Sequence, residues 1–126
     1  MKPECSATIF HVKDREVSAK YYIDILGFTH EFTYWDLSGF EYGAVLIYLS
    51  GPKQDVNKIA GQGSIYIFCD EVDDYYKDIS AKGARISMPL EDRAYGMRDF
   101  SITDPDGNLI TFGKSVEKSE PQKETA

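Results

Sequence analysis

Few residues in this chain of 126 have the types and spacing that catalysis requires. Cys5 and Cys69 are far apart and form no Cys-x-x-Cys pair, so they predict neither a disulfide framework nor a zinc site. Ser64 and Ser101 lack the Gly-x-Ser-x-Gly setting of an activated nucleophile, and no base can be paired with either from the sequence. We therefore expect no catalytic residue and only structural roles for both serines.

The two histidines do not change this expectation. His30 lies in an aromatic, strand-like run without an identifiable partner, and His11 is a single histidine close to the end of a predicted strand. A lone histidine in that position is typical of a hydrogen-bonded or pocket-lining side chain rather than of a metal ligand.

Aromatic residues are the more informative group, at 13% of the chain. Their rings offer stacking surfaces to flat ligands and attract cations over their faces. The net charge of −7 also favours cationic ligands and argues against nucleic acid, which needs a basic surface. The candidate ligand-binding residues are Trp35, Phe40, Tyr42, Tyr48, Tyr66, Phe68 and His11, with Glu31, Asp36 and Glu41 as acidic neighbours.

The elements that would position these residues follow from local patterns. Asp14 is suited to cap a helix that ends at Gly27, and Asp70 to open a second helix that ends at Gly83. Strands are predicted at residues 7–12, 28–35, 40–42, 44–49, 64–69 and 84–88, with a break at 36–39 and a connection at 51–63.

The segment 95–112 predicts a hairpin. Apolar residues alternate with polar ones on both sides of Asp-Pro-Asp-Gly-Asn at 104–108, which has proline to fix φ and glycine and asparagine to accept positive φ. Phe100, Ile102, Ile110 and Phe112 should therefore share one face of two paired strands.

Matched spacings indicate an internal duplication. Asp14 and Asp70 are 56 residues apart, as are Gly27 and Gly83 (70 − 14 = 83 − 27 = 56). The predicted fold class is α+β: two tandem β-α-β-β-β units, at about 5–50 and 63–114, form a curved mixed-sheet trough with helices on the outer face. We expect one domain at 1–114 and a disordered tail at 115–126.

Strand alternation assigns side chains to the two faces of the sheets. The trough should receive Ile9, His11, Leu46, Tyr48, Tyr66 and Phe68, whereas Phe10, Val12, Val45, Ile47, Ile65, Ile67 and Cys69 should lie under the helices. The rings of Phe32, Tyr34, Trp35, Phe40 and Tyr42 could line a groove or close the core.

With these motifs in place, residues 7–113 resemble the vicinal oxygen chelate superfamily, which includes glyoxalase I, extradiol dioxygenases and fosfomycin and bleomycin resistance proteins. The resemblance is carried by Val12-Lys13-Asp14, Tyr21-Tyr22, Leu26-Gly27-Phe28, Asp70-Glu71-Val72 and the turn at 104–108. The segment Tyr-Gly-Met-Arg-Asp-Phe at 95–100 looks most like the bleomycin-resistance-type branch. It contains Arg98, the remaining candidate ligand-binding residue.

The resemblance implies where metal-dependent members hold their divalent ion. The corresponding positions here are Ala7, Ser64, Thr111 and Tyr48. Alanine offers no donor, and neutral hydroxyls replace imidazole or carboxylate poorly. We therefore expect no metal and no other cofactor.

These observations favour a metal-free, homodimeric, cytoplasmic protein similar to bleomycin resistance proteins, which sequesters an aromatic or cationic antibiotic in a groove of the dimer. No nucleic-acid or membrane partner is expected. One alternative is a glyoxalase-like lyase or isomerase using His11 with Tyr48 or Tyr66. Another is a structural or regulatory dimer without a ligand.

Overall fold

A computed structural model describes residues 1–54 and 57–116. The strands and helices follow in the order β1 (Thr8–His11), α1 (Arg15–Lys20), the π-helical turn η1 (Tyr21–Ile25), β2 (Thr29–Tyr34), β3 (Leu37–Tyr42), β4 (Val45–Ser50), β5 (Ser64–Phe68), α2 (Val72–Ala81), β6 (Arg85–Asp92), β7 (Met97–Thr103) and β8 (Leu109–Ser115). The predicted duplication of a β-α-β-β-β unit is confirmed.

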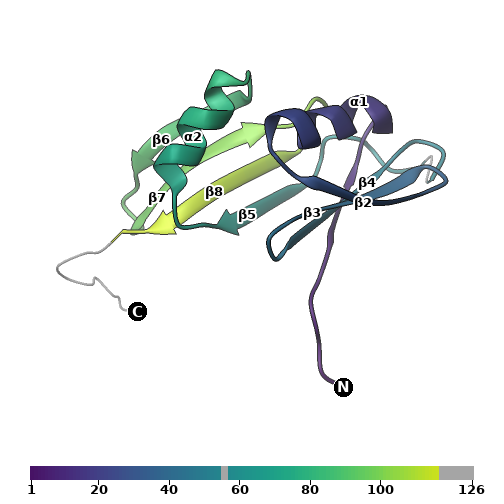
Figure 1. Cartoon of the computed structure of the whole chain (residues 1–126), viewed down its shortest axis with the longest axis horizontal. Coiled ribbons are helices and arrows are strands. Elements are labelled where there is room, and N and C mark those ends of the chain that lie inside the picture. Colours follow the sequence, from purple (N-terminus) through teal and green to yellow (C-terminus); the bar gives the residue numbers. More distant parts are fainter. Residues whose placement is uncertain (55–56, 117–126) are drawn as a thin grey trace.

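Each unit forms its own four-stranded mixed sheet. The strand orders are β1-β4-β3-β2 and β5-β8-β7-β6, so the first strand of each unit pairs in parallel with the last. Both helices cover the same side of the molecule (Figure 1). The opposite face of each sheet carries no helix, and we call it the trough face.

The first helix begins and ends as the sequence predicts. The Asp14 carboxylate accepts hydrogen bonds from the backbone N–H groups of Glu16 and Val17 and so caps α1. Gly27 takes a φ of +84°, which favours glycine, and the chain turns there into β2.

The buried side of this helix does not follow a regular apolar stripe. Val17 is 54% exposed, and the small Ser18 is buried in its place. The turn after Lys20 is π-helical, which alters the angular spacing of the side chains, and Tyr21, Tyr22 and Leu26 are all buried.

The predicted break at 36–39 is also wrong. Leu37, Ser38 and Gly39 belong to β3, and the chain reverses at Trp35 and Asp36. Trp35 itself adopts the left-handed conformation with a φ of 54°, so no glycine is needed for the turn.

The second unit repeats this plan with small differences. Glu71 is the N-cap of α2, so Asp70 stands one residue before the cap, and Gly83 takes a φ of +96° at the helix end. Strand β6 runs to Asp92, beyond the predicted end at Met88, with register shifts along its pairing with β7. Strand β8 includes Ser115, which the sequence placed in the tail; residues 117–126 of that predicted tail lie outside the described residues.

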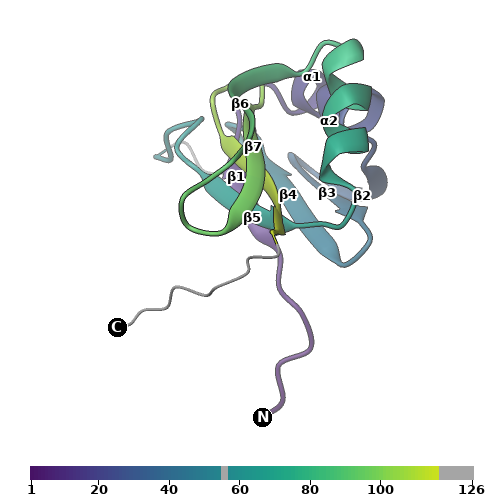
Figure 2. The same ribbon diagram turned by 90° about the vertical axis from the view of Figure 1, so that its left-hand side faces the viewer.

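The core lies between the helices and the sheets of both units. Figure 2 shows both helices on the same side of the sheets, with α1 behind α2 in this view. The side chains predicted to lie under the helices do so: Phe10, Val12, Ile47 and Ile67 are buried, and Val45, Ile65 and Cys69 pack against them. The hairpin residues Phe100, Ile102, Ile110 and Phe112 complete the core.

The turn at 104–108 joins the two units through hydrogen bonds. Asn108, fully buried, accepts from the Gly63 N–H at 2.8 Å and donates to the His11 carbonyl at 3.3 Å. Asp104 is also fully buried, and its carboxylate accepts from the Tyr22 hydroxyl at 3.0 Å. We call this five-residue turn the clasp.

Asp106, a further residue of the clasp, forms hydrogen bonds to the first helix and to the residue just before its cap. The Asp106 carboxylate accepts from the Lys13 backbone N–H at 3.2 Å and from the Ser18 hydroxyl at 3.4 Å. This contact explains why a small polar residue, rather than Val17, occupies the buried position on α1.

Across residues 1–54 and 57–116, no helix has the length and apolar character needed to cross a membrane.

Replacing Asn108 by alanine should disrupt the clasp and destabilise the fold. Truncation leaves the half-buried Gly63 N–H and the His11 carbonyl without these partners, which should lower the free energy of unfolding by about 2–4 kcal/mol. Urea denaturation measures the change. Gln62→Ala, an exposed amide truncation beside the clasp, is the matched control and should change stability by about 0.5 kcal/mol or less. Equal losses in both variants would contradict the role of the clasp.

Candidate functional site

The trough faces gather three of the six aromatic binding candidates, Tyr48, Tyr66 and Phe68. Because Phe10, Ile47 and Ile67 point into the core, their neighbours along each strand point the other way. Phe68 is 76% exposed and Ile9 53% exposed, whereas His11, Leu46, Tyr48 and Tyr66 are half-buried. The predicted assignment of these residues to the trough is confirmed.

On the first sheet, Tyr48 is held against Phe32. The two rings meet edge to face with centroids 5.1 Å apart. Gly39, the partner of Tyr48 on β3, has no side chain, and the Phe32 ring lies where a Cβ atom would stand. This glycine lets an aromatic ring lie directly on the sheet.

A pair of carboxyl groups stands beside these rings. Glu41, two residues along β3 from Gly39, pairs across the sheet with Leu46 and so shares the trough face. A hydrogen bond with the Glu31 carboxyl, together with repulsion between the two charges, raises the pKa of Glu41. A bound cation would relieve that repulsion.

The second sheet repeats the arrangement of a ring over a glycine. The ring and hydroxyl of Tyr66 occupy the space that a Cβ atom at Gly113 would need. The Tyr66 and Phe68 rings lie 5.0 Å apart at an interplanar angle of 45°. Phe68, on the outer end of β5, is the more exposed of the two.

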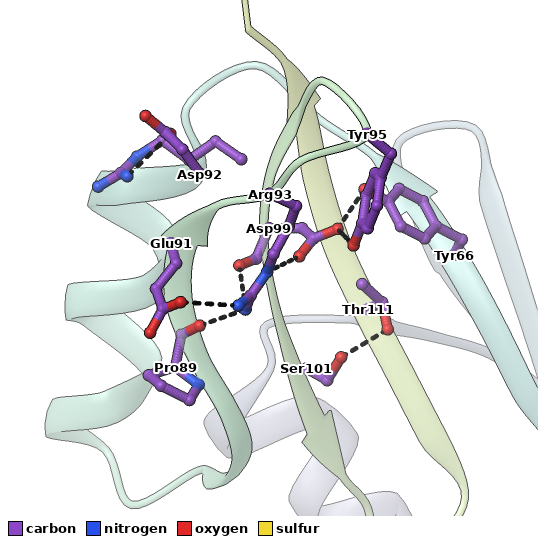
Figure 3. A network of polar contacts seen from close by, with 10 residues as sticks. Tyr66, Pro89, Glu91, Asp92, Arg93, Tyr95, Asp99, Ser101 and Thr111 are labelled. Atoms are coloured by element: carbon purple, nitrogen blue, oxygen red, sulfur yellow. Dashed lines mark hydrogen bonds and ion pairs between the residues drawn. The ribbon is translucent and has the colours of Figure 1, made fainter.

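Tyr66 is anchored by a buried carboxylate that the sequence did not single out. Asp99, 2% exposed, accepts hydrogen bonds from the hydroxyls of Tyr66 at 2.8 Å and Tyr95 at 2.7 Å, and from the Arg93 guanidinium at 2.8 Å (Figure 3). Arg93 also donates to Glu91 and to the carbonyl of Pro89. The whole network is therefore tied to β6.

The hydrogen bonds around Asp99 determine the protonation states of Asp99 and Tyr66 as well as the positions of their side chains. Burial acts to raise the pKa of Asp99, but hydrogen bonds from Arg93, Tyr95 and Tyr66 outweigh it and hold the pKa below its usual range. Burial and the bond to Asp99 raise the pKa of Tyr66. At neutral pH the site therefore presents a neutral phenol on an ionised carboxylate, which suits anchoring rather than proton transfer.

Three of the predicted binding residues do not lie on the trough faces, and these predictions need correction. Phe40 is fully buried on the helix side, stacked 6.2 Å from the Tyr22 ring. Tyr42, two residues on, shares that side and contacts Phe28 and Tyr75. The break predicted at 36–39 hid the alternation of the continuous strand β3.

Arg98 is the third of these residues. On β7 it shares the helix side with Phe100, and its guanidinium donates to both carboxylate oxygens of Asp73 on α2 at 2.9 Å. It also pairs with Asp92 at 3.2 Å. Arg98 thus fastens α2 to the second sheet, and the arginine on the trough side is Arg93.

Trp35 and Asp36 occupy the tip of the β2–β3 hairpin. Trp35 is 63% exposed, so its ring is available for contact. Asp36 instead turns inward, where it accepts from the Arg15 side chain at 3.1 Å and the Lys53 N–H at 2.9 Å. Asp36 is therefore not the free acidic group that the sequence indicated, and its bonds hold the Trp35 turn in place.

His11 lies on β1, paired with Ser50 on β4, two residues along from the Ile9–Tyr48 pair. It lines a small hollow with Val12, Lys13 and the connection after β4, and its carbonyl accepts from Gly61 at 3.1 Å. Within the described residues no hydrogen bond joins His11 to Tyr48 or Tyr66; the Tyr66 hydroxyl is committed to Asp99. The described residues therefore lack the arrangement of His11 bonded to Tyr48 or Tyr66 that the lyase alternative requires.

The family's metal positions do not fit a divalent ion in this chain. Ala7 has no donor atom, and the Thr111 hydroxyl is hydrogen-bonded to Ser101 at 2.7 Å (Figure 3). Tyr48 packs against Phe32, which leaves Ser64 as a neutral hydroxyl without a strong co-ligand. Across residues 1–54 and 57–116, no group of three or more histidine, cysteine, aspartate or glutamate side chains is placed to hold a metal.

Sequence reasoning left Phe32 open between the groove and the core, and it missed Arg93, Tyr95 and Asp99 as the polar support of Tyr66. The alternation of β7 carried part of this information, because Asp99 and Ser101 must face away from Phe100 and Ile102. The loop at 93–96 has no alternation of apolar and polar residues, so the positions of Arg93 and Tyr95 could not be found in the same way.

Replacing Asp99 by asparagine should destabilise the fold in a pH-dependent manner. The change leaves the Arg93 guanidinium without its buried counter-ion and should cost about 3 kcal/mol at pH 7. Because the folded-state pKa of Asp99 is lowered, its ionised form stabilises the protein above about pH 4, and this stability is lost as the pH falls through the folded-state pKa. The difference between variant and parent should therefore shrink towards pH 3.

Urea denaturation at pH 7, 5 and 3 measures this difference. Asp24→Asn, which removes an exposed carboxylate paired with Lys20, is the control and should have little effect at any of these pH values. A loss for Asp99→Asn that stays constant down to pH 3 would contradict an ionised Asp99.

Comparison with known proteins agrees with this geometry. Bleomycin resistance proteins of Geobacillus stearothermophilus and Staphylococcus aureus are each 36% identical to this chain over 59 residues, which is 46% of this chain and 45% of theirs. The match thus spans about half the length of these curated relatives.

Solved structures share the fold over nearly the whole chain. A glyoxalase/bleomycin resistance protein/dioxygenase from Nocardioides has a TM-score of 0.78 at 19% identity, covering 99% of this chain and 91% of its own. TnmS3, an antibiotic binding protein from Streptomyces sp. CB03234, has a TM-score of 0.76 at 16% identity, with coverages of 90% and 97%. A lactoylglutathione lyase from Agrobacterium tumefaciens has a TM-score of 0.73 at 22% identity, with coverages of 90% and 96%.

Residues 7–112 match the family model of the same group. With two β-α-β-β-β units, a trough face on each sheet and this match, the chain belongs to the Glyoxalase/Bleomycin resistance protein/Dioxygenase superfamily.

Proposed function

We propose that this protein is a metal-free small-molecule binding protein that sequesters a flat aromatic or cationic compound, such as an antibiotic, in a groove formed between two copies of the chain. The observation that carries the proposal is the first trough face, where the Phe32–Tyr48 pair lies beside the hydrogen-bonded carboxyl groups of Glu31 and Glu41. Rings stack on a flat ligand, and neighbouring carboxylates attract its positive charge.

The names of relatives support the class of ligand. Bleomycin resistance proteins align with half of the chain, and TnmS3, named as an antibiotic binding protein, shares its fold. The lyase named among the structural neighbours points to enzyme activity. The residues at the metal positions disfavour that function here, as does the lack of a hydrogen bond between His11 and Tyr48 or Tyr66 in the described residues.

The proposal of a dimer rests on the exposure of the trough faces. Phe68 and Ile9 expose most of their apolar side chains on the two sheets, and burying such a surface against a second copy is favourable. A second copy would also supply the opposite wall of a groove, so a ligand held there would contact two chains.

Tyr48→Ala should weaken binding of a flat aromatic cation. Proflavine, which is cationic at pH 7.5, serves as the probe, and quenching of the fluorescence of Trp35, the single tryptophan, reports its affinity. Loss of the stacking ring should cost about 0.5–1.5 kcal/mol, or roughly two- to twelvefold in Kd. Ile23→Ala, which truncates an exposed apolar side chain on η1, is the matched control and should leave the Kd unchanged.

Two further measurements with the same assay test whether binding depends on the charge of the ligand and on a metal ion. Acridine, the uncharged parent ring at this pH, should bind more weakly than proflavine, and a Glu41→Gln variant should narrow that difference. EDTA should leave both the Kd and the melting temperature unchanged. Loss of binding on chelation, restored by a divalent ion, would contradict metal-free binding.

Phe68→Glu should convert a dimer into monomers. A carboxylate at the centre of an apolar contact would have to be buried without a partner, which is strongly unfavourable. Sedimentation should give about twice the 14.3 kDa chain mass for the parent protein and the chain mass for the variant. Ile59→Glu, at an equally exposed apolar position in the connection after β4, is the control and should remain dimeric. A monomeric parent protein at micromolar concentration would rule out the shared groove.

A further inference from the structure

A cavity on the helix side of the molecule shares only Phe68 with the residues assigned to the trough. It lies where the two units meet, between the β3–β4 turn, the end of β5 and the first turns of α2, and its volume is about 480 Å³. This volume is in the range of small-molecule sites in proteins. We call it the seam cavity; its floor is formed by core residues that include Ile67 and Phe112.

Aromatic rings form the walls of the seam cavity. Tyr42 meets Tyr75 edge to face at 6.0 Å and Phe28 at 5.4 Å, and Tyr75 meets Phe112 at 4.8 Å. The Tyr75 hydroxyl donates to the Leu26 carbonyl at 2.6 Å, which fixes its ring. Tyr42 is 47% exposed, so part of its surface remains open to a ligand.

Carboxylates surround the same cavity. Glu71, Asp74 and Asp78 line it at intervals of three and four residues, which place them along one side of α2, and Asp70 lines it from just before the helix. Among these four, Asp78 pairs with the exposed Lys82 at 3.3 Å. In residues 1–54 and 57–116 no ion pair engages Asp70, Glu71 or Asp74, and no lysine or arginine lines the cavity.

The combination selects for one ligand chemistry. An apolar cavity with aromatic walls attracts organic groups, and uncompensated carboxylates add a negative potential that a cation neutralises. An anion would be repelled, and a strongly hydrated metal ion would find aromatic walls instead of a ring of oxygen ligands. We propose that the seam cavity binds a small organic cation, such as an alkylammonium group, independently of the trough.

Choline and its uncharged carbon analogue, 3,3-dimethylbutan-1-ol, test this proposal. The two compounds have the same shape and differ in charge at the trimethylated centre. Amide chemical shifts of the ¹⁵N-labelled full chain locate binding, and choline should move the signals of Gly43, Ala44, Cys69 and Glu71, which belong to the cavity lining. The uncharged analogue should have little effect at the same concentrations.

Variants then separate the two contributions. Tyr42→Ala should raise the Kd for choline about threefold or more through loss of a ring face, and Glu71→Gln with Asp74→Asn should do the same through loss of charge. Asp24→Asn, which removes an exposed carboxylate on η1 outside the cavity, should leave the Kd unchanged. Tyr48→Ala should also leave it unchanged, because Tyr48 lies on the trough face.

Three results would overturn the seam cavity as a cation site. These are an equal response to the uncharged analogue, shifts confined to residues outside the cavity, and a weakening by Asp24→Asn as large as that caused by the Glu71 and Asp74 changes. If choline does not bind in the seam cavity, proflavine should still bind in the trough. If proflavine does not bind in the trough, choline should still bind in the seam cavity.

Discussion

The arrangement of this molecule depends on two buried polar side chains, Asp104 and Asn108. A buried carboxylate is costly unless its oxygens are hydrogen-bonded, and Asp104 accepts bonds from three backbone N–H groups of its own turn, from the Tyr22 hydroxyl and from the Asn108 amide. Asn108 in turn holds Gly63 and His11. The same few atoms therefore shape the last hairpin and join it to the first unit.

This clasp also determines where the trough residues stand. Strand β7 ends and β8 begins on either side of it, with Thr103 paired to Leu109. That register places Ser101 opposite Thr111 and Asp99 opposite Gly113, and it brings Tyr66 on β5 within reach of the Asp99 carboxylate. Packing alone would tolerate small sliding of the sheets, whereas directional hydrogen bonds restrict it.

Much of the fold could be predicted because local chemistry was strong and repeated. The caps and glycines at matched positions gave the two units, and alternation gave the core faces of β1, β4, β5, β7 and β8. The assignment was incomplete at β3, where a polar stretch looked like a loop, so the faces of Phe40 and Tyr42 were left open and both were named as binding candidates. Glycine and serine were tolerated there because Phe32 covers Gly39, a contact between strands that no local pattern contains.

The candidate site was less predictable for the same reason. The rings of Tyr48, Tyr66 and Phe68 follow from strand period, but their polar support comes from side chains that meet only in three dimensions. Arg98 and Arg93 illustrate the difference: five residues apart, one fastens α2 and the other holds Asp99. Composition and motif cannot tell which arginine faces which side when a loop lies between them.

The bare backbone at Gly39 and Gly113 has a consequence for how such a protein can change during evolution. Each glycine sets the depth at which one ring rests, so a single added methyl group would lift Phe32 or Tyr66 away from its sheet. At Gly113 the displaced ring would also leave Asp99. One nucleotide substitution, without any change in the residues that touch a bound compound, could therefore make the trough shallower and alter the range of molecular thicknesses that it admits.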